Sequence, residues 1–189
     1  SSQKGRILRV SMKIDNHPHV LIAAYAPSIA AERPPFFQHL AARLTRNTVL
    51  AIDANCVPDT TLDLKRTATS PYQNQGAAEL RQAVDDKQLR DIIRELHGSA
   101  PCFSAHHIVG GGHTCWSRID QIYVPTDQHT QYNIAPPGDI FPKPHTNMHS
   151  EYELDHLMVD VRSATVRPKR GNDTPRISEE IFDDLAFVN

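Results

Sequence analysis

The chain lacks the features that would place it in several special classes of protein. Its 189 residues contain three cysteines, an odd number without framework spacing, which favours a reducing intracellular environment over a secreted disulfide scaffold. No apolar run approaches the ~18 residues of a membrane span, and the first residues contain no apolar core of a signal peptide. The formal net charge of -2 argues against a uniformly basic nucleic-acid coat, although local basic patches remain compatible with it.

The first residue is not methionine. The absence of an initiator Met predicts a processed product, an excised domain or an internal fragment. The length suits one domain, which we expect over residues 1–165, with a linker and a short helix over 166–189. Ser178 suits the N-cap of that helix, because the acidic residues that follow it would lie at the positive helix end.

What the chain does contain is an alternation of strand and helix patterns. Residues 7–14 alternate apolar and polar side chains and residues 19–25 are nearly all apolar, which predicts a hairpin of a half-buried and a central strand. Residues 34–44 have helical apolar spacing, and a short buried strand follows over 49–53, so an α/β fold is indicated. The other expected elements are one bent helix or two over 76–96 and strands over 102–107, 119–124 and 157–161, with long loops over 56–74 and 125–155.

Two short polar motifs follow predicted strands in the first half of the chain. Tyr25 begins Y-A-P, either as a buried phenol before a turn proline or as a donor to an anion in a cleft. Asp53 and Asn55 of D-A-N point the same way in an extended segment, at the carboxyl end of a strand, where open α/β sheets bind ligands. An Asx turn would also explain this pair, so both interpretations stay open at this point.

Two more polar motifs lie in the second half. Ser117, Arg118 and Asp120 belong to S-R-I-D, where a surface ion pair is the simplest explanation of the charges. Asp155 and His156 are adjacent, and both reach one site only if Asp155 still belongs to the preceding loop. Together the four motifs match the needs of metal-dependent phosphodiester hydrolysis, namely a carboxylate for a divalent cation, a base for water and donors for phosphate oxygens. Hard oxygen ligands favour Mg²⁺ or Mn²⁺.

The order Y-A-P, D-x-N, S-R-I-D and D-H resembles the endonuclease/exonuclease/phosphatase superfamily. The stretches D-A-N-C-V-P-D-T-T-L-D, Q-G-A-A-E-L and S-R-I-D-Q-I-Y-V are most similar to the endonuclease domain of LINE-type non-LTR retrotransposons, and the resemblance covers nearly the whole chain. P-R-I-S-E-E-I-F-D-D-L-A-F-V resembles the segment that leads from that domain to the reverse transcriptase.

The resemblance implies a fold and an activity. The fold would be α/β (α+β), a two-sheet α/β sandwich with pseudo-symmetric halves, here without much of its N-terminal half because the chain starts at the strand that leads into Y-A-P. The activity would be Mg²⁺-dependent (or Mn²⁺-dependent) nicking of DNA, in the nucleus, leaving a 3′ hydroxyl that primes a reverse transcriptase domain in the same polyprotein. No membrane partner is implied.

The resemblance also implies roles for the first two motifs. Asp53 would be the base that activates water, or a ligand of a second metal ion. Asn55 would hold the scissile phosphate and the attacking water. Tyr25 would donate a hydrogen bond to the phosphate.

The remaining roles fall on the second half of the chain. Asp155 would place the metal ion. His156 would bind a phosphate oxygen, with Asp120 stabilising its imidazolium. Ser117 and Arg118 would line a rim that faces the DNA.

The chain departs from the family pattern in ways that keep other functions open. Ile52, Ala54, Gln121 and Leu154 stand where the family has Gly, Phe, an aromatic residue and Ser, and the family's N-terminal Asn and metal-binding Glu have no counterpart. The alternatives are a catalytically silent, degenerate domain or nucleic-acid-binding fragment, and a phosphatase of the same superfamily. The cysteines and histidines between 102 and 115 suggest a structural zinc site, although their spacing, C-x3-H-H-x5-H-x-C, matches no familiar ligand pattern.

Overall fold

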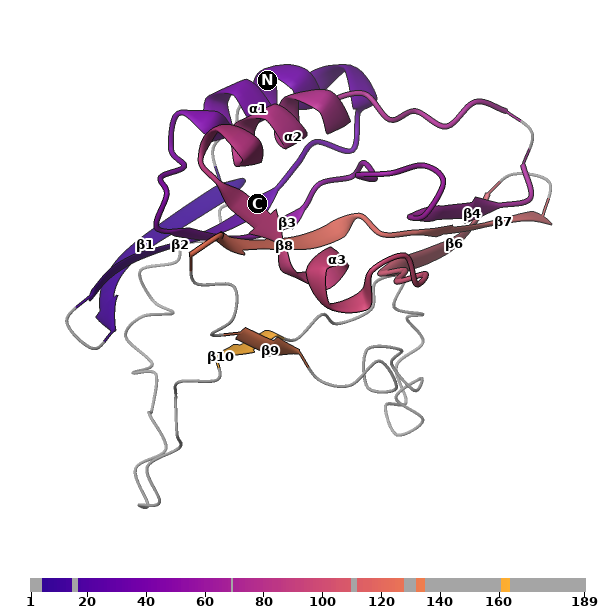
Figure 1. Ribbon diagram of the computed structural model, residues 1–189. Helices are drawn as coiled ribbons and strands as arrows, with labels where there is room; N and C mark the ends of the chain where they lie inside the picture. The colour runs from indigo at the N-terminus through magenta and orange to yellow at the C-terminus, as the bar shows by residue number, and fades with distance from the viewer. Residues whose placement is uncertain are drawn as a thin grey trace, which may run out of the picture.

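The structure is a computed structural model that describes residues 5–14, 17–68, 70–109, 112–127, 132–134 and 161–163 (Figure 1). The largest sheet consists, in spatial order, of β1 (Ile7–Ile14), β2 (His17–Tyr25), β3 (Thr48–Asp53), β8 (Asp120–Pro125) and β5 (Leu89–Asp91). A second sheet consists of β4 (Leu64–Arg66), β7 (His113–Ser117) and β6 (Ala105–Val109), and β9 (Tyr132–Ile134) pairs with β10 (Val161–Ser163). The helices in the described residues are η1 (Ala30–Glu32), α1 (Arg33–Ala41), α2 (Ala77–Asp86) and α3 (Ile92–His97).

The strand pairing confirms the predicted hairpin and the α/β organisation. Strands β1 and β2 are antiparallel, and β2 runs parallel to β3 after a crossover that contains α1. Strand β8 is antiparallel to both β3 and β5. The carboxyl ends of β2 and β3 and the start of β8 therefore meet at one edge of the large sheet.

The two faces of the large sheet are covered differently. Ile22, Leu50 and Ile52 pack under α1 and α2, in a core that also contains Phe36 and Leu40. Figure 1 shows α1 and α2 together on this face and α3 on the opposite one.

The opposite face is apolar but only partly covered. There Val49, Ile122 and Val124 pack against Ile92 and Ile93 of α3. Because side chains alternate along a strand, the strand register shows that this face continues on β1 and β2 through Leu8, Val10, Met12 and Leu21. These four residues are 51%, 37%, 38% and 39% exposed, respectively.

Of the two alternatives for residues 76–96, the structure has two helices, separated by β5, because Gln88 has φ 57° and breaks the first helix, while the Asp91 carboxylate accepts from Arg94 N and starts the second. Other predicted boundaries are wrong. Helix α1 ends at Ala41, although Leu44 is buried beyond its end. The loop over 56–74 contains β4, the strand expected over 102–107 is β6 (Ala105–Val109), and β7 was not predicted.

Other predictions lie outside the described residues. They include the helix after Ser178, most of the strand over 157–161 and most of the loop over 125–155, in which the described part contains β9. The division at residue 165 therefore stays a prediction. No helix among the described residues has the length and apolar character needed to cross a membrane.

Candidate active site

Three of the predicted site residues form one row across the large sheet. The register places Tyr25 beside Asp53 and Asp53 beside Asp120, so strands β2, β3 and β8 each contribute one member. Directly paired residues project from the same face of a sheet. The row, which we call the acidic row, lies at the polar end of the face that carries Val49 and Ile122.

The D-A-N segment forms a tight turn that ties the acidic row to Y-A-P. Asn55 has φ 50°, and its N–H donates to Asp53 Oδ1 at 2.9 Å, which is an Asx turn. The Asn55 side-chain amide donates to Ala26 O at 2.9 Å, and Ala26 N donates to Asp53 O at 2.8 Å. The Asx turn and the position of Asp53 and Asn55 at the carboxyl end of β3 therefore occur together. The hydrogen bonds of the turn hold both residues at that position.

The segment that leads into Asp120 is fixed by buried hydrogen bonds. The Ser104 hydroxyl oxygen accepts from Ile119 N at 3.1 Å and from Asp120 N at 2.9 Å. Ile119 O accepts from Ala54 N at 2.8 Å, so this segment is bound to the D-A-N turn as well. Sequence reasoning missed Ser104 because an isolated serine in a loop carries no signal of its partners.

The structure corrects the position of Arg118. The side chain is 2% exposed, so it does not line a rim that could face DNA. Its Nε and Nη2 donate to the two carboxylate oxygens of Asp63 at 2.7 and 3.0 Å, and its Nη1 donates to Asp91 Oδ2 at 2.7 Å. Burial alone would lower the pKa of Arg118, but the hydrogen bond and charge of Asp63 and the charge of Asp91 raise it above its ordinary value.

Ser117 is also buried, but it borders a small cavity close to the acidic row. The cavity has a volume of about 250 Å³ and is lined by Asn55, Arg66, Tyr72, His107 and Ser117, among other residues. The guanidinium of Arg66 lies 5.9 Å from the ring centroid of Tyr72. The cavity therefore joins Asn55 to a cationic side chain that the motifs did not indicate.

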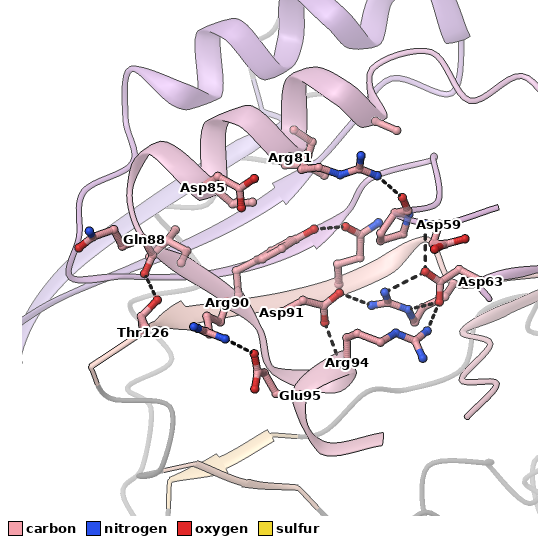
Figure 2. Close-up of a pocket in the computed structure, with 18 of the residues that line it drawn as sticks. Asp59, Asp63, Arg81, Asp85, Gln88, Arg90, Asp91, Arg94, Glu95 and Thr126 are labelled. Carbon is pink, nitrogen blue, oxygen red and sulfur yellow. Dashed lines mark hydrogen bonds and ion pairs between the residues drawn. The ribbon is translucent and has the colours of Figure 1, made fainter. Parts of the chain in front are cut away.

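A larger cavity of about 1080 Å³, which Arg118 helps to line, is bordered by residues of α2, β5 and α3 (Figure 2). Gln121, which replaces the family's aromatic residue, is buried there; it donates to Cys56 O at 2.9 Å and accepts from the Tyr123 hydroxyl at 2.5 Å. Burial raises the pKa of Tyr123 well above its ordinary value. Neither the acidic row nor Asn55 lines this cavity, whereas Asn55 lines the smaller one, so the larger cavity is separate from the candidate site.

Two further arginines support the Y-A-P end of the row, and sequence reasoning missed both. Arg6 lies with its guanidinium carbon 5.2 Å from the ring centroid of Tyr25, whose side chain is 49% exposed. Arg33 is buried and donates to Pro27 O at 3.1 Å, to Ser28 O at 2.8 Å and to Gln73 O at 2.8 Å. Their partners are mostly carbonyl oxygens, which no side-chain motif reveals.

The zinc alternative finds no support where the chain is described. His107 is paired with Cys115, whereas the neighbouring His106 projects from the other face and stacks on Trp116 with ring centroids 3.8 Å apart. Cys102 packs instead against α3. Within the described ranges no three His, Cys, Asp or Glu side chains come together as metal ligands. Asp155 and His156 lie outside those ranges.

Comparison with known proteins identifies the fold. No family model matches the chain. The transposon TX1 uncharacterized 149 kDa protein of Xenopus laevis is 28% identical over 123 residues, which are 64% of this chain and 9% of that protein. The endonuclease domain of TRAS1, a telomere-specific non-LTR retrotransposon, superposes with a TM-score of 0.50 and 16% identity, over 80% of this chain and 60% of that domain. The AP endonuclease LMAP from Leishmania major gives a TM-score of 0.58 with 16% identity, over 81% and 53%.

Proposed function

Because the chain has the α/β fold of the endonuclease/exonuclease/phosphatase proteins, we propose that it is the nuclease part of a retrotransposon protein and hydrolyses phosphodiester bonds in DNA. The acidic row is the observation that carries this proposal. Two carboxylates and a phenol lie side by side at one edge of the sheet, and an amide is hydrogen-bonded to the central member. A structural role alone does not require an acid and a phenol at the ends of three adjacent strands.

The chemistry follows from what each side chain offers. Asp53, held by Asn55 N–H, would accept the proton of the attacking water. Asn55 would orient the water and the scissile phosphate with the amide group that Ala26 O already fixes. The half-exposed Tyr25 would donate a hydrogen bond from its hydroxyl group to a phosphate oxygen, with the Arg6 cation over its ring adding positive charge.

The row would hold a divalent cation of the hard type. Carboxylate oxygens suit Mg²⁺ or Mn²⁺, and Asp53 supplies such oxygens in the described part of the site, with Asp155 as the further predicted ligand. When bound, the cation would supply positive charge to the phosphate oxygens. His156 remains the predicted donor to the phosphate, with Asp120 as the group that favours its charged form.

The wider setting is part of the same proposal. The chain spans 9% of the TX1 protein and 60% of the TRAS1 endonuclease domain. What a whole protein of this kind does is therefore part of the proposal. We infer that the cut leaves a 3′ hydroxyl that primes a reverse transcriptase domain in the same polyprotein, and that it acts in the nucleus.

Nicking of supercoiled plasmid in Mg²⁺ by the 189-residue chain tests the proposal. We expect Asp53→Ala to lower the rate by a factor of about 100 to 10,000, the usual contribution of a positioned base. Asp86→Ala is the matched control, since Asp86 is an exposed carboxylate at the end of α2 that accepts a hydrogen bond from Gln82, one turn earlier in the same helix. Equal nicking by the Asp53→Ala and unsubstituted chains would exclude this site.

The same preparation separates the alternatives. Hydrolysis of a soluble phosphomonoester without nicking would identify a phosphatase of the same fold. DNA binding without Mg²⁺-dependent hydrolysis would identify a catalytically silent domain.

A further inference from the structure

We propose that Arg118 is a positioning residue, whose buried ion pairs with Asp63 and Asp91 fix the segment that brings Asp120 into the acidic row. This inference rests on the proposed function and deepens it. It assigns the arginine of S-R-I-D to the interior of the domain, where it acts through Asp120, and not to a contact with DNA. It also gives roles to Asp63 and Asp91, which belong to none of the four motifs.

The guanidinium of Arg118 uses all three of its nitrogen atoms on two carboxylates. Nε and Nη2 bind the two oxygens of Asp63 in a bidentate arrangement, and Nη1 binds Asp91 Oδ2. The main chain repeats the connection, because Arg118 N donates to Asp63 O at 2.9 Å. A planar fork with both of its edges satisfied permits little rotation or translation.

The two carboxylates are themselves held from other directions (Figure 2). Asp63 accepts from Asp59 N at 3.1 Å and forms an ion pair with Arg94 of α3. Asp91 caps α3 through its other oxygen, which accepts from Arg94 N at 3.1 Å. Arg118 is therefore anchored to the loop after Asn55 and to the start of α3, two parts of the chain distant from it in sequence.

One residue, Ile119, separates this anchor from Asp120. Ile119 is buried, its N–H donates to Ser104 Oγ and its carbonyl accepts from Ala54 N. With Arg118 fixed at one end and the β3–β8 pairing at the other, the Asp120 Cα stays opposite that of Asp53. A buried charge network costs desolvation energy, and fixing a register is the best-attested benefit that offsets it.

Two matched substitutions test the inference in the full chain. Arg118→Lys keeps the positive charge but loses the fork, so Asp63 and Asp91 are no longer held together. Arg90→Lys makes the same change at an exposed arginine outside this network, whose side chain pairs with Glu95 at 2.7 Å. We expect kcat for nicking to fall about 100-fold in Arg118→Lys with KM changed by less than about threefold, and both to stay near their original values in Arg90→Lys.

Amide hydrogen exchange provides a readout that does not depend on activity. We expect the N–H groups of Ile119 and Asp120 to exchange faster in Arg118→Lys than in Arg90→Lys. Asp63→Asn, which preserves size but removes the charge that Arg118 binds, should reproduce both effects and replaces Arg118→Lys if that variant does not fold.

The outcomes separate the two proposals. Unchanged exchange at Ile119 and Asp120 together with unchanged kcat in Arg118→Lys and Asp63→Asn would overturn the positioning role, while leaving the nuclease intact. Equal losses of kcat in Arg118→Lys and Arg90→Lys would also overturn it, because the loss would then not depend on the ion pairs of Arg118. Failure of the unsubstituted chain to nick DNA would overturn the proposed function, and the exchange data would still decide the positioning of Asp120.

Discussion

Gly76 offers a test of the packing that supports the Y-A-P end of the site. It precedes α2 with φ +95°, and a Cβ atom built on it would lie 2.6 Å from Phe37 Cε2 and 2.7 Å from Arg33 Cβ. Both neighbours are buried, so neither can move without disturbing the core under α1. In Gly76→Ala the left-handed backbone costs about 1 kcal/mol. Overpacking costs a further 1–3 kcal/mol or so, which gives a total loss of about 2–4 kcal/mol in the free energy of unfolding.

Gly112→Ala is the matched control. Gly112 also has a positive φ, of 76°, but a Cβ atom there meets nothing within 4 Å. We therefore expect this variant to lose only the backbone contribution of about 1 kcal/mol. Urea denaturation of both variants measures the difference, which isolates the clash with Phe37 and Arg33. Equal losses in the two variants would refute the packing argument.

The same substitution reaches the candidate site through Arg33. Its guanidinium holds the carbonyls of Pro27 and Ser28, two and three residues after Tyr25. Displacement of Arg33 should therefore lower the nicking rate of Gly76→Ala under conditions in which the variant is fully folded, whereas Gly112→Ala should nick at the original rate.

Three other outcomes follow from the structure. Burial raises the pKa of Cys56 to about 12, so in the folded chain at pH 8 this thiol should not react with a disulfide reagent, whereas it should react once the chain is unfolded in guanidinium. Burial also raises the pKa of Tyr72 from 10.0 to about 12, so the neutral phenol stabilises the folded state below pH 10. The urea midpoint should therefore fall as the pH rises from 10.0 to about 12, and it should fall less in Tyr72→Phe. Tyr25→Phe should lower nicking by about 10- to 100-fold, the value of one hydrogen bond to a charged group, with an unchanged urea midpoint because the half-exposed ring still stacks with Arg6.

The acidic row shows how far the sequence leads. Tyr25, Asp53 and Asp120 could be placed at strand ends because apolar alternation locates strands to within a few residues. Their alignment in one row could not be predicted, because it depends on β8 pairing with β3 across a long stretch of chain. Periodicity describes each strand alone and contains no information on its neighbours.

The position of Arg118 could not be read from its own segment. S-R-I-D looks like the start of a strand with an outward arginine, but residues 118–119 are a break between β7 and β8. The partner that draws the side chain inward is Asp63, in a loop that the sequence presents only as polar. Strand β7 was missed for a related reason: H-T-C-W-S lacks clear apolar alternation, and its pairing with β4 and β6 defines it.

The acidic row depends on the exact register of β3, because the parallel pairing with β2 places Asp53 beside Tyr25. A slip of β3 by one residue would exchange its two faces and turn Asp53 toward the helices, where Leu50 and Ile52 now pack, while Val49 and Ala51 would turn away from α3. Such a misfolded chain would bury a carboxylate under the helices and lose the alignment of Tyr25, Asp53 and Asp120 on which the proposed activity depends. If the chain nicks DNA as proposed, a preparation with this fault retains secondary structure but does not nick.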